Sequence, residues 1–574
     1  MRLIVCAWLA ACGAWLAACS AGPPGPGIDA ARAMVHVHAL VALGPHPGES
    51  QEAQRAAAYI AEQLQAIGAV VERVPVGTVT IPAIDVLGRH VRDAKTRVTT
   101  DPDLVVRFGP AGGRALLVMA HYDTVPTSPG GVDNAAAVGV VLELARALAA
   151  APPAIPVLLA FTANEEIGLV GAEALVARRG DDVAFAVALD LIGGTGALSL
   201  NGASRLIGGA ELAWIARAAD RAGVIVRAPL PHRVVSRAWP QAERSDHGPF
   251  TRRGIPAVHF YHRGQDGEWI DLAYHGARDT AARVDRDALD EVGRLLRALT
   301  QVAPPPHDGD GFWLPVALNT VVPRWAVVTL EGALAALALG LLAALRTRRA
   351  RGGLGLLAGA GCLAVAISVT IAVERLAGYP GAWLHAPAPW VLGEIAVLVG
   401  ALGLITGVAR RFAPWVGDRR YLAVAIALPL AIGLAALLAD GAELAWIWLI
   451  PAAAAAVAPR LGRLAVIALP VTLLPGALVL LPNQLREAAW NGFLPIGVPL
   501  TAWVVVSLVS PLAALAWWLR KAPTRGPLGA LVLPMGCALA TLAGALMMLR
   551  ADVACSATQF REVSLACEVT GRMR

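Results

Sequence analysis

The sequence ALLVMAHYDT at residues 115–124 joins a buried-strand pattern to polar groups at its end. An unbroken apolar run leads directly into His121 and Asp123. A second apolar run, at residues 155–163, leads in the same way into the acidic pair Glu165-Glu166. Open α/β sheets bind ligands outside the carboxyl ends of their strands. The two stretches therefore predict an α/β fold with a ligand site at that edge.

Three more polar residues follow the same rule. Asp133 stands between the two apolar runs, where a helical pattern begins. A third run, at residues 183–189, ends in Asp190, and a fourth, at 257–261, precedes His275. Carboxylates and neutral imidazoles suit zinc or a similar divalent ion. Because this set contains no cysteine, a structural zinc site of the cysteine type is excluded.

Taken in order, these motifs resemble those of the M28 family of zinc aminopeptidases and carboxypeptidases. The matching residues are the HxD pair His121 and Asp123, the bridging Asp133, the paired Glu165 and Glu166, the third-strand Asp190 and the late His275. A loop at residues 244–250, with Asp246 and His247, also resembles a family loop. Each motif is common alone, but their ordered combination is specific. The resemblance covers about residues 30–303 and implies a zinc-exopeptidase-like α/β fold, a mostly parallel mixed sheet flanked by helices.

The resemblance also implies two zinc ions that share one carboxylate. The expected ligands are His121 and Asp190 for one ion, Glu166 and His275 for the other, and Asp133 for both. In this family a cis peptide bond commonly follows the bridging aspartate, so we expect one between Asp133 and Asn134.

Further roles are implied for the residues beside the ligands. Glu165 is expected to act as the general base toward the attacking water. Asp123 is expected to accept a hydrogen bond from the second ring N–H of His121 and so to fix its tautomer. We expect Asp246 and His247 to support the ligands from behind.

Composition divides the chain. Of its 574 residues, 56% are hydrophobic and 16% are charged, which is unusual for a water-soluble protein. The apolar excess lies beyond a proline-rich break at residues 304–310. We expect a signal peptide at 1–21, a peptidase domain at 22–303, a linker at 304–324, an all-α polytopic membrane domain at 325–549 and a tail at 550–574.

The membrane domain is expected to contain about eight helices. The expected spans are residues 325–345, 353–373, 389–409, 421–439, 442–458, 464–481, 498–519 and 527–549. Basic residues cluster in alternate loops, namely Arg346, Arg348, Arg349, Arg351, Arg410, Arg411, Arg419, Arg420, Arg460, Arg463, Arg520, Lys521 and Arg525. The opposite loops hold only Arg375 and Arg486. By the positive-inside rule, the peptidase domain and the tail lie outside the cytoplasm.

The amino terminus agrees with export. Arg2 precedes an apolar run, and LAACS at residues 16–20 resembles a lipoprotein signal box in which Cys19 is the lipidated residue. Cleavage after Ala21 and an uncleaved anchor are alternatives. In the tail, Cys555 and Cys567 are predicted to form a disulfide, because that compartment allows one.

The fused architecture is similar to that of M28 proteases of the endoplasmic reticulum and vacuolar membranes. The composition, rich in alanine, arginine and glycine, suggests a bacterium, so we expect a multipass protein of the bacterial inner membrane with a periplasmic catalytic domain. Peptides and membrane lipid are the expected partners. Because the positive charge follows the loops, it gives no support for nucleic-acid binding. Two alternatives stay open: a glutaminyl-cyclase-like transferase with one zinc, and a transporter or scaffold that carries a peptidase-like domain.

Overall fold

The computed structural model divides the chain into two units, at residues 1–324 and 325–574. Most of residues 27–344 is described, with gaps at 82–83, 87–88, 93, 202–206, 208, 227–244, 263–272, 307–312 and 318–319. Beyond these, the structure describes 419–438 and a few positions between 445 and 457. The expected signal peptide, Cys19 and the cysteines of the tail lie outside the described residues.

The first unit is built around a seven-stranded sheet in the order β1-β4-β6-β5-β7-β9-β8. Its centre, β6-β5-β7-β9, is parallel, whereas β1, β4 and β8 pair antiparallel at the two sides. The strands are β1 (Glu72–Ile81), β4 (Lys95–Phe108), β5 (Ala115–His121), β6 (Val157–Thr162), β7 (Val183–Leu189), β8 (Leu198–Asn201) and β9 (Ala257–His262). The predicted mixed sheet is therefore present, with three of its six strand pairs parallel.

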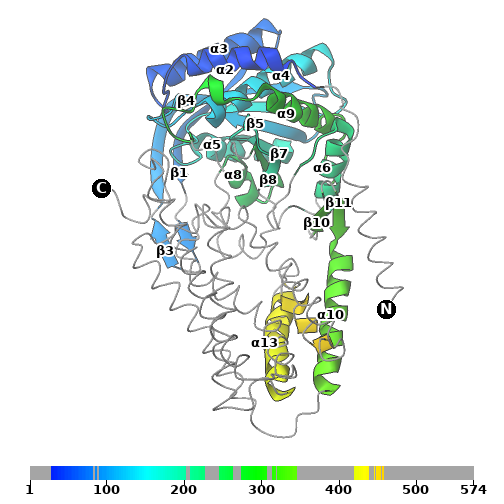
Figure 1. The fold of residues 1–574 in the computed structure, drawn as a ribbon. Helices are drawn as coiled ribbons and strands as arrows, with labels where there is room; N and C mark the ends of the chain where they lie inside the picture. Colours follow the sequence, from blue (N-terminus) through cyan, green and yellow to red (C-terminus); the bar gives the residue numbers. More distant parts are fainter. Residues whose placement is uncertain are drawn as a thin grey trace, which may run out of the picture. The chain divides into compact units, whose positions relative to one another are not determined.

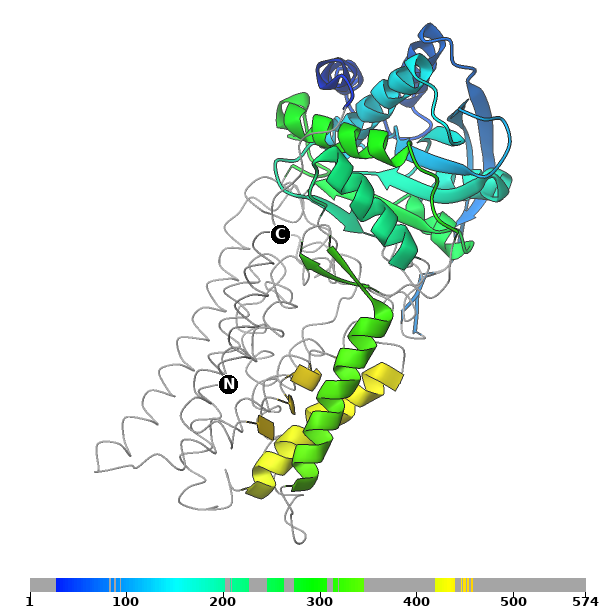
Figure 2. The ribbon, with the colours of Figure 1, turned by 90° about the vertical axis from the view of Figure 1, so that its right-hand side faces the viewer.

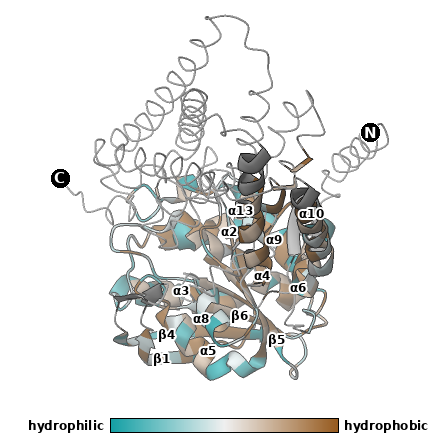
Figure 3. Cartoon of the chain, turned by 90° about the horizontal axis from the view of Figure 1, so that it is seen from below, coloured by the Kyte–Doolittle hydropathy of each residue, from teal (hydrophilic) through white to brown (hydrophobic). Residues whose placement is uncertain are grey.

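The four parallel strands coincide with the four apolar runs of the sequence. Every residue of β5, β6 and β9 is buried, because helices cover both faces of this part of the sheet. Along β5 and β6, Figure 3 shows mostly hydrophobic residues, whereas hydrophilic residues are more frequent on α5 (Val170–Arg179).

Helices form a layer on each face of the sheet (Figures 1 and 2). One face carries α2 (Ala30–Val41), α4 (Ala136–Ala150), α6 (Gly209–Ala222) and α9 (Arg286–Leu299), with α3 (Gln51–Ala66) beside them. The other face carries α5 and α8 (His247–Arg252). On the first face, Trp214 of α6 contacts Phe185 of β7 edge to face, with ring centroids 5.2 Å apart.

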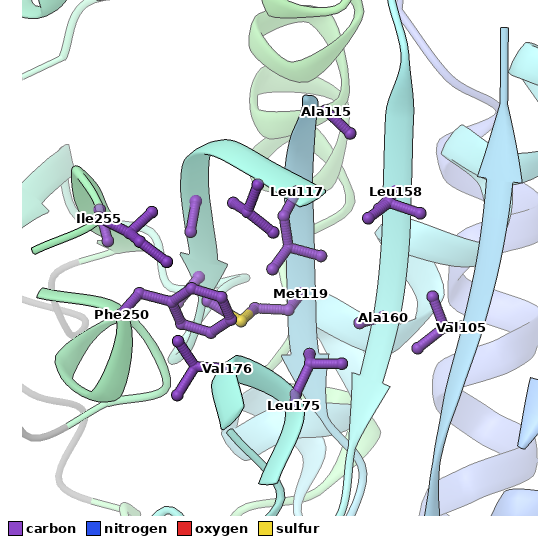
Figure 4. Close-up of a cluster of buried hydrophobic side chains, with 14 of the residues drawn as sticks. Val105, Ala115, Leu117, Met119, Leu158, Ala160, Leu175, Val176, Phe250 and Ile255 are labelled. Carbon is purple, nitrogen blue, oxygen red and sulfur yellow. The ribbon is translucent and has the colours of Figure 1, made fainter. Parts of the chain in front are cut away.

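The core on the second face joins the sheet to α5 and α8 (Figure 4). Leu117 and Met119 of β5 lie among Leu175 of α5 and Phe250 of α8, and all of them are buried. Truncation of such a leucine to alanine typically costs about 2–5 kcal/mol. This packing holds α5 and α8 against the strands whose ends carry the polar motifs.

The order of the strands explains where a site can form. The chain passes from β5 through α4 to β6 on one side of β5, and then through α5 to β7 on its other side. Because α4 and α5 cover opposite faces, the connections diverge at the carboxyl end of β5. Such a reversal leaves a crevice at the sheet edge, which is where α/β proteins bind ligands.

The described part of the chain also contains two hairpins and two long helices. The hairpins pair β2 (Ile84–Val86) with β3 (Arg89–Arg92), and β10 (Trp313–Ala317) with β11 (Thr320–Pro323). The helices α10 (Arg324–Ala344) and α13 (Arg419–Leu438) coincide with the predicted spans at 325–345 and 421–439. Within the part of the chain that the structure describes, none of the helices combines the length and the apolarity that a membrane crossing requires. The other predicted spans lie wholly or largely outside the described residues, so the membrane domain stays a prediction.

Candidate metal centre

The predicted ligands gather at the carboxyl ends of the three central strands. His121 is the last residue of β5, Glu165 and Glu166 follow β6, and Asp190 follows β7 directly. Asp133 lies in an irregular turn, Gly131–Ala135, that leads into α4. The peptide bond from Asp133 to Asn134 is cis, as predicted. His275 comes from the segment after β9, so residues far apart in the sequence meet at one place.

Asp133 lies between two histidines. Its Oδ1 is 3.3 Å from Nε2 of His121, and its Oδ2 is 3.3 Å from Nε2 of His275. On the first side, Oδ1 of Asp190 lies 3.6 Å from the same His121 nitrogen. On the second side, Oε2 of Glu166 lies 3.2 Å from the His275 nitrogen. The carboxylate of Asp133 is therefore shared by two sets of nitrogen and oxygen atoms.

These distances fit metal coordination better than direct pairing. Zinc bonds of about 2.0–2.1 Å in a tetrahedron place neighbouring ligand atoms about 3.3 Å apart, close to the separations observed. Nε2 of His275 forms no hydrogen bond despite its two carboxylate neighbours, and neither does the buried Oε1 of Glu166. In the described residues, groups able to hold a metal ion are His121 with Asp133 and Asp190, Asp133 with Glu166 and His275, and His121 with Glu165 and Glu166. The residues present thus suit a divalent ion.

Asp123 has a different contact from the one expected. Nδ1 of His121 lies 3.1 Å from the backbone carbonyl of Asp123 and 3.7 Å from its carboxylate. The carboxylate instead accepts hydrogen bonds from the backbone N–H groups of Glu165, at 2.9 Å, and Glu166, at 3.2 Å. Asp123 therefore fixes the His121 ring through its carbonyl oxygen and the Glu165-Glu166 turn through its carboxylate.

Burial and charge shift the pKa values of the acidic residues. Burial raises the pKa of Glu165 well above its usual value, and the charges of Glu166 and Asp190 add to this effect against that of His121. Burial, with the charge of Asp133, likewise raises the pKa of Glu166 to about 7. Burial alone would raise the pKa of Asp133 too, but its close contacts with His121 and His275 hold that pKa below its usual value. Glu165 has the environment expected of a carboxylate that takes up a proton.

Asp246 and His247 lie at the start of α8 and contact neighbours of the candidate ligands. The Asp246 carboxylate accepts a hydrogen bond from the hydroxyl of Thr162, and burial raises the pKa of Asp246 to about 6. The His247 ring is buried and stacks on His259, with ring centroids 5.6 Å apart. Nε2 of His259 in turn lies 3.3 Å from the carbonyl oxygen of Asp190. The supporting role of Asp246 and His247 stays a prediction.

Two residues that sequence reasoning did not assign to the site also belong to it. The ring of Tyr274 stacks on that of His275, with centroids 3.7 Å apart and an interplanar angle of 24°. Burial and the nearby carboxylates, Asp133 first, raise the pKa of Tyr274 well above 10, which keeps its hydroxyl protonated. Its place beside His275 was the only signal available. The second residue is His259, which contacts the Asp190 backbone.

Comparisons of sequence agree with the geometry. A family model described as Peptidase family M28 matches residues 103–300. Aminopeptidase YwaD of Bacillus subtilis is 29% identical over 194 residues, which make up 32% of this chain and 39% of the relative. The vacuolar membrane protease of Candida albicans (strain WO-1) is 41% identical over 76 residues, 13% of this chain and 9% of that protein. The sequence comparisons thus support an M28 peptidase-like domain, although the chain spans well under half the length of these relatives.

Solved structures that are similar to this chain include an aminopeptidase and a glutaminyl cyclase. The aminopeptidase from Aneurinibacillus sp. strain AM-1 has a TM-score of 0.38 and 17% identity, over 49% of this chain and 97% of that one. A glutaminyl cyclase from Bacteroides thetaiotaomicron has a TM-score of 0.39 and 19% identity, over 49% of this chain and 99% of that one.

Proposed function

We propose that the first unit is a zinc-dependent exopeptidase, and specifically an aminopeptidase, with two zinc ions at the site. The observation that carries this proposal is the Asp133 carboxylate, which offers one oxygen to the His121 side and the other to the His275 side. A shared carboxylate with one histidine and one further carboxylate on each side supplies more ligands than a single tetrahedral ion needs. When bound, the ions would polarise the scissile carbonyl and lower the pKa of a water molecule.

The protein's own residues would carry the proton steps. In this proposal the Glu165 carboxylate takes a proton from the attacking water and later delivers it to the leaving amine. The hydrogen bonds from the Glu165 and Glu166 backbones to the Asp123 carboxylate hold the turn that carries both glutamates. In the same proposal, Tyr274, whose ring stacks on that of His275, would donate a hydrogen bond from its hydroxyl to the developing oxyanion.

The test uses the full-length chain, purified without chelator. Elemental analysis should give about two zinc equivalents, and aminoacyl p-nitroanilides should be cleaved while their N-acetylated forms are not. Removal of zinc by a chelator should abolish cleavage, and added zinc should restore it. One zinc equivalent together with cyclisation of N-terminal glutamine would replace this proposal by the cyclase-like one. Bound zinc without turnover of any peptide would favour the scaffold or transporter alternative.

We also propose that the protein is anchored in a bacterial inner membrane, with the peptidase domain and the tail in the periplasm. The support is the distribution of basic residues between alternate loops, with the apolar composition beyond residue 304. Alkaline phosphatase fused after Arg351 should be inactive, and the same reporter fused after Arg574 should be active. Equal activity of both fusions would contradict the proposed topology.

A further inference from the structure

Two loops that supply opposite parts of the metal centre are tied together by one buried aspartate. Asp279 is 1% exposed and lies 146 residues beyond Asp133 in the sequence. Its Oδ1 accepts a hydrogen bond of 2.7 Å from the backbone N–H of Val132, and its Oδ2 accepts one of 3.1 Å from that of Asp133 itself. The hydroxyl of Ser128 donates to the same Oδ2 at 3.4 Å.

Backbone contacts reinforce this connection. The N–H of Gly131 donates to the carbonyl oxygen of Asp279 at 2.9 Å. On the other side of the loop, the hydroxyl of Thr127 donates to the carbonyl oxygen of His275 at 2.7 Å. A Cβ atom on Gly131 would lie only 2.4 Å from the carbonyl oxygen of Thr280, so the two segments are in close contact. The segment that carries His275 and the turn that carries Asp133 are therefore connected by hydrogen bonds and by close packing.

We propose that Asp279 is the positioning residue that sets the bridging Asp133 between the two metal sites. Asp133 must point one oxygen to each side, and it stands in an irregular turn in which Asp133 and Asn134 lack helical backbone angles. Hydrogen bonds to the N–H groups of Val132 and Asp133 fix the backbone at this residue. Because Asp279 follows His275 in a short segment, the same carboxylate fixes the distance between a bridging ligand and a terminal one. Residues that orient metal ligands in this way typically change metal affinity by about 10–100-fold when mutated.

The chemistry of the carboxylate makes a sharp test possible. Each oxygen of Asp279 accepts from a backbone N–H. An asparagine has the same shape but only one acceptor oxygen, so its NH₂ group would face a backbone N–H donor. Asp279→Asn should therefore disturb the turn at Asp133 without removing volume. Asp285→Asn is the matched control, since Asp285 accepts a hydrogen bond from a backbone N–H at the start of α9, is partly exposed and lies outside the centre.

The inference rests on the proposed metal function, so the experiment measures zinc affinity by chelator competition in the full-length chain. Asp279→Asn should bind zinc about 10–100-fold more weakly than wild type, and Asp285→Asn should match wild type. In an Asp133→Ala background, Asp279→Asn should change the affinity by less than about 2-fold, because the group that it positions is gone. When cobalt(II) replaces zinc, the visible spectrum of Asp279→Asn should differ from that of wild type.

A merely structural role would give a different pattern. It would lower the melting temperature of the zinc-free Asp279→Asn protein but leave its zinc affinity and cobalt spectrum unchanged, and that result would overturn the proposal. Equal losses of affinity from Asp279→Asn with and without Asp133 would overturn it too. If wild type itself bound no zinc, the proposed function would fail first.

Should Asp279→Asn not fold, Ser128→Ala carries the same test. It removes one donor to the Asp279 carboxylate and should weaken zinc binding by about 2- to 10-fold, the range expected for one hydrogen bond. Unchanged affinity in Ser128→Ala would then count against the proposal.

Discussion

Replacement of Glu165 by glutamine separates chemistry from metal binding at this site. The amide has the size of the carboxylate, and the side chain is only 9% exposed, so little repacking is expected. The backbone N–H of Glu165 donates to Asp123 at 2.9 Å, and this bond does not depend on the side chain. The substitution therefore removes the proton acceptor and leaves the turn in place.

The expected loss of activity in Glu165→Gln follows from the role of Glu165 as general base. Burial, with the charges of Glu166 and Asp190, raises the pKa of Glu165 well above its usual value, which suits a group that accepts a proton in one step and returns it in the next. A general base typically contributes about 10²–10⁴-fold, or about 3–5.5 kcal/mol at 1.36 kcal/mol per decade. We expect kcat on an aminoacyl p-nitroanilide to fall by at least about 10²-fold.

The assay combines initial rates with elemental analysis of the same preparation. Glu62→Gln, on the exposed side of α3, makes the same change of charge away from the site and should behave as wild type. Near-normal turnover in Glu165→Gln would remove Glu165 from the mechanism. Loss of zinc together with activity would instead make Glu165 a ligand, as its place in one candidate group with His121 and Glu166 allows.

Two further predictions concern stability. Burial would raise the pKa of Glu143, but hydrogen bonds outweigh this, His36 first at 3.1 Å, and hold the pKa below its usual value. A carboxyl group with a lowered pKa stabilises the fold at pH values above its unfolded-state pKa. Glu143→Gln should therefore lower the free energy of unfolding in urea by about 1.5–3 kcal/mol at pH 7, and this loss should shrink below about pH 4. A loss that does not depend on pH would contradict this prediction. Gly131→Ala should lower the free energy of unfolding by about 1–3 kcal/mol, because its Cβ would lie 2.4 Å from a backbone oxygen. Gly112→Ala is the control: Gly112 has open space around it, so the free energy of unfolding should change by less than about 0.5 kcal/mol. Equal stabilities of the two variants would refute the steric argument.

The central strands could be predicted from the sequence because their environment is simple. β5 and β6 are buried on both faces, and their residues ALLVMAH and VLLAFT are almost uniformly apolar. The strands at the sides of the sheet have no such pattern. β1, with the sequence ERVPVGTVTI, alternates between exposed and buried residues and carries a register shift between Pro75 and Gly77. Its pairing with β4 depends on contacts that the local sequence does not encode.

The candidate metal ligands could be recognised in the sequence for a different reason. Each of His121, Glu166 and Asp190 stands at or just after the end of a recognisable strand, and the order of the motifs resembles that of a known family. The contacts of Asp123 were not predictable, because spacing alone does not decide whether a carbonyl or a carboxylate oxygen meets the His121 ring. The tie between Asp279 and Asp133 was hidden as well, since it exists only when distant segments meet.

The position of each ligand indicates what holds it. His121, Glu166 and Asp190 come from the ends of adjacent parallel strands, whose spacing is set by the hydrogen bonds of the sheet and by the packed core beneath it. Asp133 and His275 come from loops, and the hydrogen bonds of Asp279, Ser128 and Thr127 connect these loops. Changes in the core, such as truncation of Leu117, should therefore lower the stability of the whole domain and leave the zinc affinity of the folded protein unchanged. Changes in the loop contacts should lower the zinc affinity and leave the stability of the domain nearly unchanged, because they leave the sheet intact and move the one carboxylate that both halves of the site share.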